Sequence, residues 1–290
     1  MPHRSALVGS VPVVPLCDGY ACLPLADELP GKRVDWEAER RSFPWAFHGE
    51  SGWAWHVHAF LLQTAGGLTL IDTGIGQLGQ PPYDVVGRVH EELGSVGISP
   101  GDIRHVVHTH LHADHAGGAC QADGGPQFPN AVHYVHPADW SFFARSTDRQ
   151  SLAGRMAMTV LEKQGRLDLG PDDREVVKGV RLVHTPGHTP GHRSVVLADG
   201  PTTLLLAGDL LHLPIQVTHP EWASSHDQDP ALGCETRIAI LNRALENDWG
   251  LAVSHFAQPF GTVLRSGSTQ AWRPLPDPVS DGRGSPVGGT

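Results

Sequence analysis

The stretch HTHLHADHAG, residues 108 to 117, crowds histidines and an aspartate into one short segment of this 290-residue chain. It contains His110, His112, Asp114 and His115. On an extended or turning segment, histidines spaced two residues apart point the same way, so His110 and His112 can bind the same metal ion. Asp114 and His115 follow around the bend. The motif therefore predicts a metal site, with a second ion held close to the first.

The residues before the motif predict where it lies. The segment IRHVVHTH, residues 103 to 110, has the composition of a short buried strand whose carboxyl end runs into the histidine cluster. Binding and catalytic residues concentrate in loops at the ends of strands. We therefore expect the motif in a loop at the edge of a sheet.

Three later positions repeat this arrangement, with one polar residue after an apolar strand. His188 lies in the Pro-Gly turns of HTPGHTPGH, Asp209 ends LLLAGD, and His255 ends LAVSH. Unpaired polar groups are costly at buried strand ends, and a shared metal would satisfy all three. A mixed set of histidines and carboxylates suits zinc, with iron, cobalt and manganese as alternatives.

The remaining pattern predicts sheets covered by helices in one compact domain over residues 1–273. A hairpin is expected at 56–64 and 68–74, and further strands at 131–136, 180–184, 192–197, 203–207 and 251–255. The expected helices are Tyr83–Leu93 ended by Gly94, one from Pro137, one over 150–163, and one from an Asp229 N-cap to about Asn247. Prolines and glycines predict a flexible tail over 274–290.

Composition limits the class of partner. The net charge, 21 − 31 = −10, opposes attraction to nucleic acid or to anionic membranes. No apolar run approaches the roughly 20 residues of a membrane helix, and the first residues lack an uninterrupted apolar signal segment. The four cysteines form no Cys-x-x-Cys pair and are expected to be free thiols. We expect a cytoplasmic protein that acts on a small molecule.

The large aromatic residues of the N-terminal region have two interpretations. Either they pack the core and its strands, or residues 1–55 form a flap that walls an apolar pocket. The residues are Trp36, Phe43, Trp45, Phe47, Trp53 and Trp55.

The ordered set of ligands resembles that of the metallo-β-lactamase-fold hydrolases. The likeness rests on His110-x-His112-x-Asp114-His115 followed by the three later positions, and it runs from about Leu68 to Phe260. It implies an α+β fold, a four-layer αββα sandwich with the site at one edge between the sheets. It also implies how the ligands divide: His110, His112 and His188 for the first ion, Asp114, His115 and His255 for the second, Asp209 bridging, and Asp72 supporting a ligand.

Within that superfamily, GDLLHLPIQVTHPEW at 208–222 most resembles acyl-homoserine lactonases and methyl-parathion-hydrolase-like enzymes. Lactonases commonly carry a tyrosine three residues after the bridging aspartate, where this chain has His212. β-Lactam cleavage is disfavoured, because clinical-type β-lactamases generally lack the bridging aspartate or the second-site histidine, and this chain has both, as Asp209 and His115. The resemblance thus implies a carboxylic ester or lactone hydrolase first and an organophosphate triester hydrolase second, and it allows a homodimer.

The expected mechanism needs no side-chain nucleophile. Two divalent ions, zinc first, would share a water and lower its pKa from 15.7 toward about 7, so that a bridging hydroxide attacks. Asp114 or Asp209 would then accept a proton. His212 is either structural or a donor to the substrate. The rival hypotheses are a mononuclear-iron oxidoreductase of the persulfide-dioxygenase type and a non-catalytic binding protein.

The other histidines beside the motifs are expected to have structural roles. His105, His108 and His184 lie on strand-like segments, and His192 ends the second Pro-Gly-His. We expect His192 to be a hydrogen-bonded support of the site.

Overall fold

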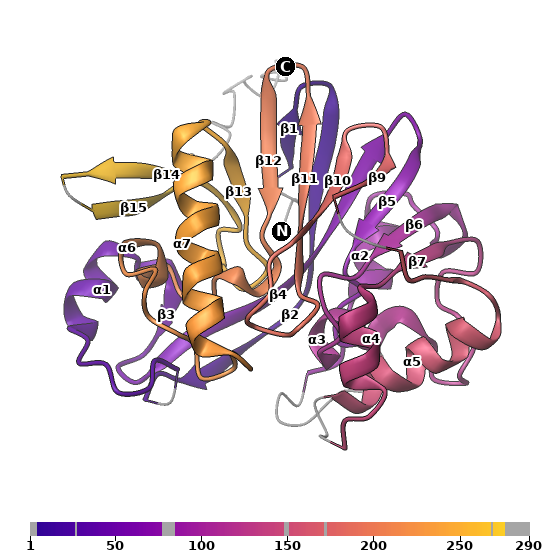
Figure 1. Cartoon of the computed structure of the whole chain (residues 1–290), viewed down its shortest axis with the longest axis horizontal. Coiled ribbons are helices and arrows are strands. Elements are labelled where there is room, and N and C mark those ends of the chain that lie inside the picture. Colours follow the sequence, from indigo (N-terminus) through magenta and orange to yellow (C-terminus); the bar gives the residue numbers. More distant parts are fainter. Residues whose placement is uncertain are drawn as a thin grey trace, which may run out of the picture.

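Two β-sheets lie face to face, with helices on their outer faces, in the computed structural model (Figure 1). The structure describes residues 5–26, 28–76, 85–147, 151–170, 173–267 and 269–275. The four-layer αββα arrangement predicted from the sequence is therefore confirmed. Its importance for function is that strands of both sheets end at the same edge.

The first sheet has the strand order β1-β2-β4-β5-β6-β7-β8, and β3 pairs with β4. Pairing is antiparallel from β1 to β5 and parallel from β5 to β8. The strands are β1 Ala6–Val8, β2 Val11–Pro24, β3 Phe47–His48, β4 Gly52–Thr64, β5 Gly67–Ile71, β6 Ile103–Val107, β7 Val132–Tyr134 and β8 Leu167–Asp168.

The second sheet has the order β15-β14-β13-β12-β11-β10-β9. In this sheet, among the described residues, β12 and β13 are the only neighbours that pair in parallel. The crossover between them contains α7, the longest helix described. The strands are β9 Glu175–Val177, β10 Val180–His184, β11 Arg193–Asp199, β12 Thr202–Leu206, β13 Gly250–Ala252, β14 Phe260–Ser266 and β15 Thr269–Pro274.

A continuous apolar core joins the two sheets. Phe60, Leu62 and Val107 of the first sheet pack in one cluster with Leu182 and Leu206 of the second. All five are almost fully buried, as period-two alternation predicts for strands with one face turned inward. This core fixes the position of the strand ends that carry the candidate site.

Helices cover the outer faces. The helix α2 (Val89–Ser95) packs Val89 and Leu93 on the first sheet, and α7 (Pro230–Glu246) packs Leu241 and Ala244 on the second. Asp229 caps α7 by accepting a hydrogen bond from the Leu232 amide, as predicted. The other helices are α1 Trp36–Ser42, α3 Ala113–Ala116, α4 Pro137–Phe143, α5 Leu152–Lys163 and α6 Ile215–Thr218.

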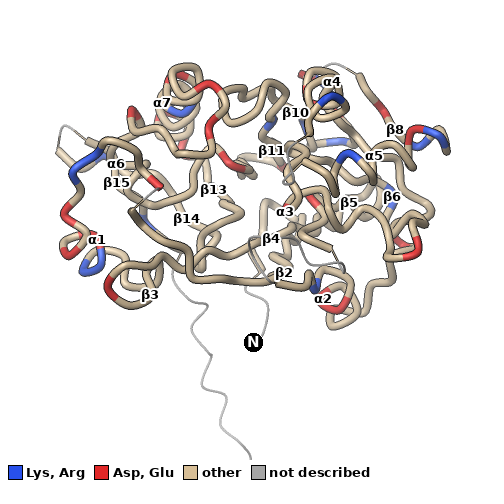
Figure 2. The backbone as a smooth tube through the Cα atoms, turned by 90° about the horizontal axis from the view of Figure 1, so that it is seen from below, with Lys and Arg blue, Asp and Glu red and all other residues tan. Residues whose placement is uncertain are grey.

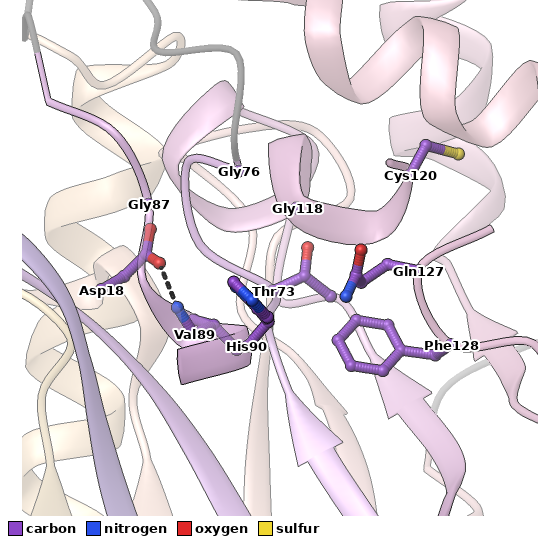
Figure 3. A pocket seen from close by; sticks show the side chains of 10 residues that line it. All are labelled: Asp18, Thr73, Gly76, Gly87, Val89, His90, Gly118, Cys120, Gln127 and Phe128. Atoms are coloured by element: carbon purple, nitrogen blue, oxygen red, sulfur yellow. Dashed lines mark hydrogen bonds between the residues drawn. The ribbon is translucent and has the colours of Figure 1, made fainter. Parts of the chain in front are cut away.

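One predicted helix begins later than expected. Residues 85–88 are not helical, residues 83 and 84 lie outside the described part, and α2 runs from Val89 past Gly94 to Ser95. The cause is Asp18 of β2, whose carboxylate accepts hydrogen bonds from the amides of Ile75, Arg88 and Val89. Figure 3 shows the bond from Val89. These bonds fix the chain in a non-helical conformation before the first turn.

The ends of the chain also differ from expectation. The long strand β2 was not predicted, because its prolines interrupt the alternation of apolar residues. The tail predicted from residue 274 begins inside β15, where Pro274 pairs with Gly261. Residues 276–290, the rest of that predicted tail, lie outside the described part of the chain.

Charged residues of both signs lie on the outer helices of the sandwich. Figure 2 shows both acidic and basic positions on the outer helices α1 and α7, whereas α2 carries acidic positions only. Within the described residues, no helix combines the length and the apolar character that crossing a membrane requires.

Replacing Phe60 tests the core between the sheets. The ring of Phe60 is 2% exposed and lies 5.9 Å from that of Phe260. Phe60→Ala should lower the free energy of unfolding by about 3–5 kcal/mol, because it leaves a cavity. Urea denaturation measures this loss. The control Leu7→Ala, at a side chain that is 69% exposed, should change it by less than about 0.5 kcal/mol. Equal losses would contradict the packing described.

Candidate metal centre

All seven predicted ligands lie together at one edge of the sandwich. His110 and His112 follow β6, and Asp114 and His115 lie on α3. His188 follows β10, Asp209 follows β12, and His255 follows β13. Six of the seven are buried and His112 is partly exposed. Strand ends of both sheets thus supply one cluster, as the sequence predicted.

The first group consists of three imidazole nitrogens. His110 Nε2 lies 2.9 Å from His112 Nδ1, which lies 3.0 Å from His188 Nε2. Asp209 Oδ2 is 3.3 Å from His188 Nε2 and 3.7 Å from His110 Nε2. Ligands that surround one zinc ion at 2.0–2.1 Å stand about 3.3 Å apart, so these separations fit a common ion.

The second group meets the other oxygen of the same aspartate. Asp209 Oδ1 lies 3.1 Å from His115 Nε2 and 3.1 Å from His255 Nε2. Asp114 Oδ2 is 3.4 Å from His115 Nε2 and 3.7 Å from His255 Nε2. Asp209 therefore stands between the two groups: Oδ1 lies beside the second group, and Oδ2 lies beside the first and also 3.2 Å from His255 Nε2.

Hydrogen bonds on the outer side of the rings determine which nitrogens face inward without a proton. Asp72 Oδ2 accepts hydrogen bonds from His115 Nδ1 at 2.8 Å and from the Thr109 hydroxyl at 2.8 Å. Since the hydroxyl proton goes to Asp72, Thr109 Oγ1 accepts from His110 Nδ1 at 3.1 Å. In the neutral rings, Nε2 of both histidines is then a lone pair directed into the cluster.

His188 and His255 are oriented in the same way. His188 Nδ1 lies 3.3 Å from Asp227 Oδ1, and His255 Nδ1 lies 2.7 Å from the carbonyl oxygen of His56. Both rings donate outward from Nδ1, so in the neutral rings Nε2 of each is a lone pair directed into the cluster. Such outer partners are the usual means of orienting metal-binding histidines.

The cluster requires positive charge at its centre. His115 Nε2 and Asp209 Oδ1 are buried, yet neither makes a hydrogen bond within the described residues although 3.1 Å separates them. Burial opposes a charged ring, but the carboxylates of Asp209 and Asp114 still raise the pKa of His115 well above its ordinary value. Without metal, protons supply part of the missing charge. The donor set and its uncompensated atoms fit two divalent cations.

A comparison with known families agrees with this geometry. The family model described as the metallo-beta-lactamase superfamily matches residues 52–268. The chain belongs to the metallo-beta-lactamase superfamily.

The chain is also similar to known relatives and to solved structures. An N-acyl homoserine lactonase from a Bacillus species is 30% identical over 171 residues, which is 52% of this chain and 62% of the relative, so the match spans about three fifths of that protein. The dizinc quorum-quenching lactonase AidC, in complex with a product, superposes with a TM-score of 0.84 at 21% identity, covering 94% and 97% of the two chains. The hydrolase AbOPH gives 0.81 at 24% identity and the same coverage.

In this member of the superfamily, a pocket opens beside the cluster. Its lining includes His112, Asp114, His188, Asp209, His212 and His255 together with Leu23, Trp53, Trp55 and His226. Trp53 and Trp55 are almost fully buried, and the Trp55 ring stacks on that of His255 at 5.5 Å. Both therefore combine the two roles considered for the N-terminal aromatic residues, since they pack the core and wall the pocket.

His212 lies in the pocket beside the bridging aspartate. Its Nε2 is 3.3 Å from Asp209 Oδ2, and its ring stacks on those of His255 and His226. His226 Nε2 in turn lies 3.4 Å from the buried carboxylate of Glu28. A hydrogen bond from His226 to Glu28 raises the pKa of His226, because the carboxylate stabilises the charged ring. Neither His226 nor Glu28 lies in a motif that predicts a place in this site.

The support of His188 was likewise not predicted from the sequence. The guanidinium of Arg237, on α7, lies 3.2 Å from Asp227 Oδ2 and donates to the carbonyl of Trp222. Both partners of this ion pair are buried. The pair fixes the loop that presents Asp227 to His188. Asp227 lies in the polar segment 224–229, where no spacing distinguishes it from a surface residue.

The remaining histidines support the frame as predicted. His192 donates from Nδ1 to the carbonyl of Thr185 at 2.8 Å and accepts from the amide of Asp209 at 3.0 Å. It thereby fixes the backbone of the bridging residue. His108 is buried against His133, with 3.0 Å between their ring nitrogens.

A second depression lies behind the loop that follows β5. Asp18, Thr73, Gly118 and Phe128 are among its lining residues (Figure 3). Gly118 approaches this loop so closely that a Cβ on it would lie 2.0 Å from the carbonyl oxygen of Thr73. The depression contains none of the seven ligands, and its polar groups hold the loop that carries Asp72.

Replacing Asp209 tests whether one carboxylate serves both groups. Asp209→Ala should bind fewer than two ions per chain after dialysis, because each group loses an oxygen donor. Metal analysis of the purified protein measures the content. The control Asp123→Ala removes an exposed carboxylate and should retain the full content. Two ions held by Asp209→Ala with unchanged affinity would contradict the bridging position.

Proposed function

We propose that this chain is a metal-dependent hydrolase that opens a lactone ring or cleaves a carboxylic ester. The observation that carries the proposal is the cluster itself, in which the ring nitrogens of five histidines and two carboxylates face one another around one buried space, and His115 Nε2 and Asp209 Oδ1 make no hydrogen bond within the described residues. His110, His112 and His188 would hold one ion, and Asp114, His115 and His255 the other, with Asp209 shared. Imidazole and carboxylate donors suit zinc best among the cations considered.

Bound ions would supply two things that the side chains lack: a water whose pKa falls toward neutrality and a Lewis acid for the carbonyl oxygen. The side chains of the protein would position the substrate and transfer protons. Asp114 lines the pocket and is 7% exposed, so its carboxylate can take up a proton without opening the site. His212 holds a ring nitrogen beside Asp209 and can donate to the substrate oxygen where charge develops.

The walls support a small substrate with an apolar part. Leu23, Trp53 and Trp55 form apolar wall beside the cluster. A net charge of −10 favours a neutral substrate over a polyanion. The named activity of the Bacillus relatives supports a lactone in particular. The N-terminal strands β2 and β4 would then determine which acyl groups fit.

A panel of lactones, carboxylic esters and phosphotriesters tests the proposal. We expect hydrolysis of at least one lactone or ester, loss of activity after chelation, and recovery when Zn²⁺ is added back. Metal analysis should give two ions per active chain. Phosphotriester cleavage alone would favour the second candidate. One iron per chain with oxygen consumption would refute a hydrolase.

Removing His212 separates proton donation from metal binding. His212→Ala should lower kcat by about 10²-fold or more if the ring donates in the rate-determining step, while two ions remain bound. Kinetics and metal analysis on the same preparation measure both quantities. The control His48→Ala changes an exposed ring and should leave both unchanged. Loss of an ion from His212→Ala would place His212 among the ligands instead.

A further inference from the structure

A second group of metal-binding residues lies outside the cluster described above. Cys17 is on β2, and His56 and His58 are on β4. The sulfur of Cys17 lies 3.8 Å from His56 Nδ1, and one ligand atom from each of the three residues lies within 4.8 Å of the others. The rings of His56 and His58 are nearly parallel, with 7° between their planes.

The pairing of β2 with β4 explains why these residues meet. Cys17 is opposite His58 in the register, and His56 lies two residues before His58 on the same face of β4. An irregularity between Cys17 and Gly19 shifts the register there. Asp18 binds the amides of Ile75 and Val89 on the other face, so the Cys17 side chain is directed toward the two histidines.

The protonation of the His58 ring favours binding of a cation. Burial lowers the pKa of His58 to about 3, so this ring is neutral at pH 7. His58 Nδ1 donates to the Ser254 carbonyl at 3.0 Å, which leaves a lone pair on Nε2. Burial also raises the pKa of the Cys17 thiol to about 11, so a cation must displace that proton, as soft cations do when they bind thiols.

We propose that Cys17, His56 and His58 form a third metal site, which binds one borderline divalent cation such as Zn²⁺. A zinc ion bonded to sulfur at 2.3 Å and to nitrogen at 2.0–2.1 Å separates the two atoms by about 3.6 Å, close to the distance between Cys17 and His56. Three protein ligands leave one position for water. His56 and Cys17 are partly exposed, so a cation can enter from solvent.

The third site borders the candidate metal centre through one hydrogen bond. The carbonyl oxygen of His56 accepts from His255 Nδ1 at 2.7 Å. The backbone of β4 therefore separates the two sites, and no side chain is shared between them. The third site can be tested without reference to activity.

Cobalt titration of the metal-free full chain tests the proposal, because only a thiolate ligand gives a near-ultraviolet sulfur-to-cobalt charge-transfer band. The candidate metal centre offers only nitrogen and oxygen ligands. We expect the band to saturate with one Co²⁺ per chain in addition to the two of the metal centre. Cys17→Ser should abolish the band and leave those two bound. No band in the unaltered protein, or a band that persists in Cys17→Ser, would overturn the proposal.

Two further variants keep the test decisive. Cys234→Ser, on α7, is the matched control and should retain the band at full intensity. His56→Gln changes a partly exposed ring without altering β2, and should weaken binding of the thiolate-linked Co²⁺ at least about 10-fold. It decides the question if Cys17→Ser fails to fold, since unchanged cobalt affinity in His56→Gln would exclude this ligand set.

Discussion

Five imidazole rings and two carboxylates converge at one edge of this protein, with ring nitrogens and carboxylate oxygens facing one another. Each of His110, His115, His188 and His255 donates its outer N–H to a fixed acceptor, and so directs a lone pair inward. Lone pairs and carboxylate oxygens at 3 to 4 Å repel one another unless a cation lies among them. The surrounding structure serves to hold these groups together against that repulsion.

The acceptors that impose this orientation come from distant parts of the chain. Asp72 follows β5 and has a φ of 60°, a left-handed conformation that aspartate tolerates better than most residues. Asp227 is held by Arg237 of α7, and the carbonyl of His56 belongs to the middle of β4. The sandwich core keeps these elements in register, so the ligands depend on packing well away from the pocket.

Much of the fold and of the candidate site was predictable, because strands and metal-binding motifs produce local patterns in the sequence. The motif around His110 and the strand ends at Asp209 and His255 all lie where the alternation of apolar residues predicted. The predicted start of α2 was wrong, because Asp18 of the remote strand β2 accepts a hydrogen bond from the amide of Val89 and so sets where the helix begins. Asp227, Glu28 and His226 escaped notice because their partners are distant in sequence: 39 residues separate His188 from Asp227. Pairings of this kind are set by tertiary packing, which no local pattern encodes.

The ligands are drawn from both sheets, with β6 and α3 on one side and the ends of β10, β12 and β13 on the other. Bound cations would therefore act as a cross-link, adding their binding free energy to the folded state only. A chain that fails to load would open first at this edge and become accessible to proteases. At a given rate of synthesis, the abundance of the protein in a cell should then follow the supply of metal.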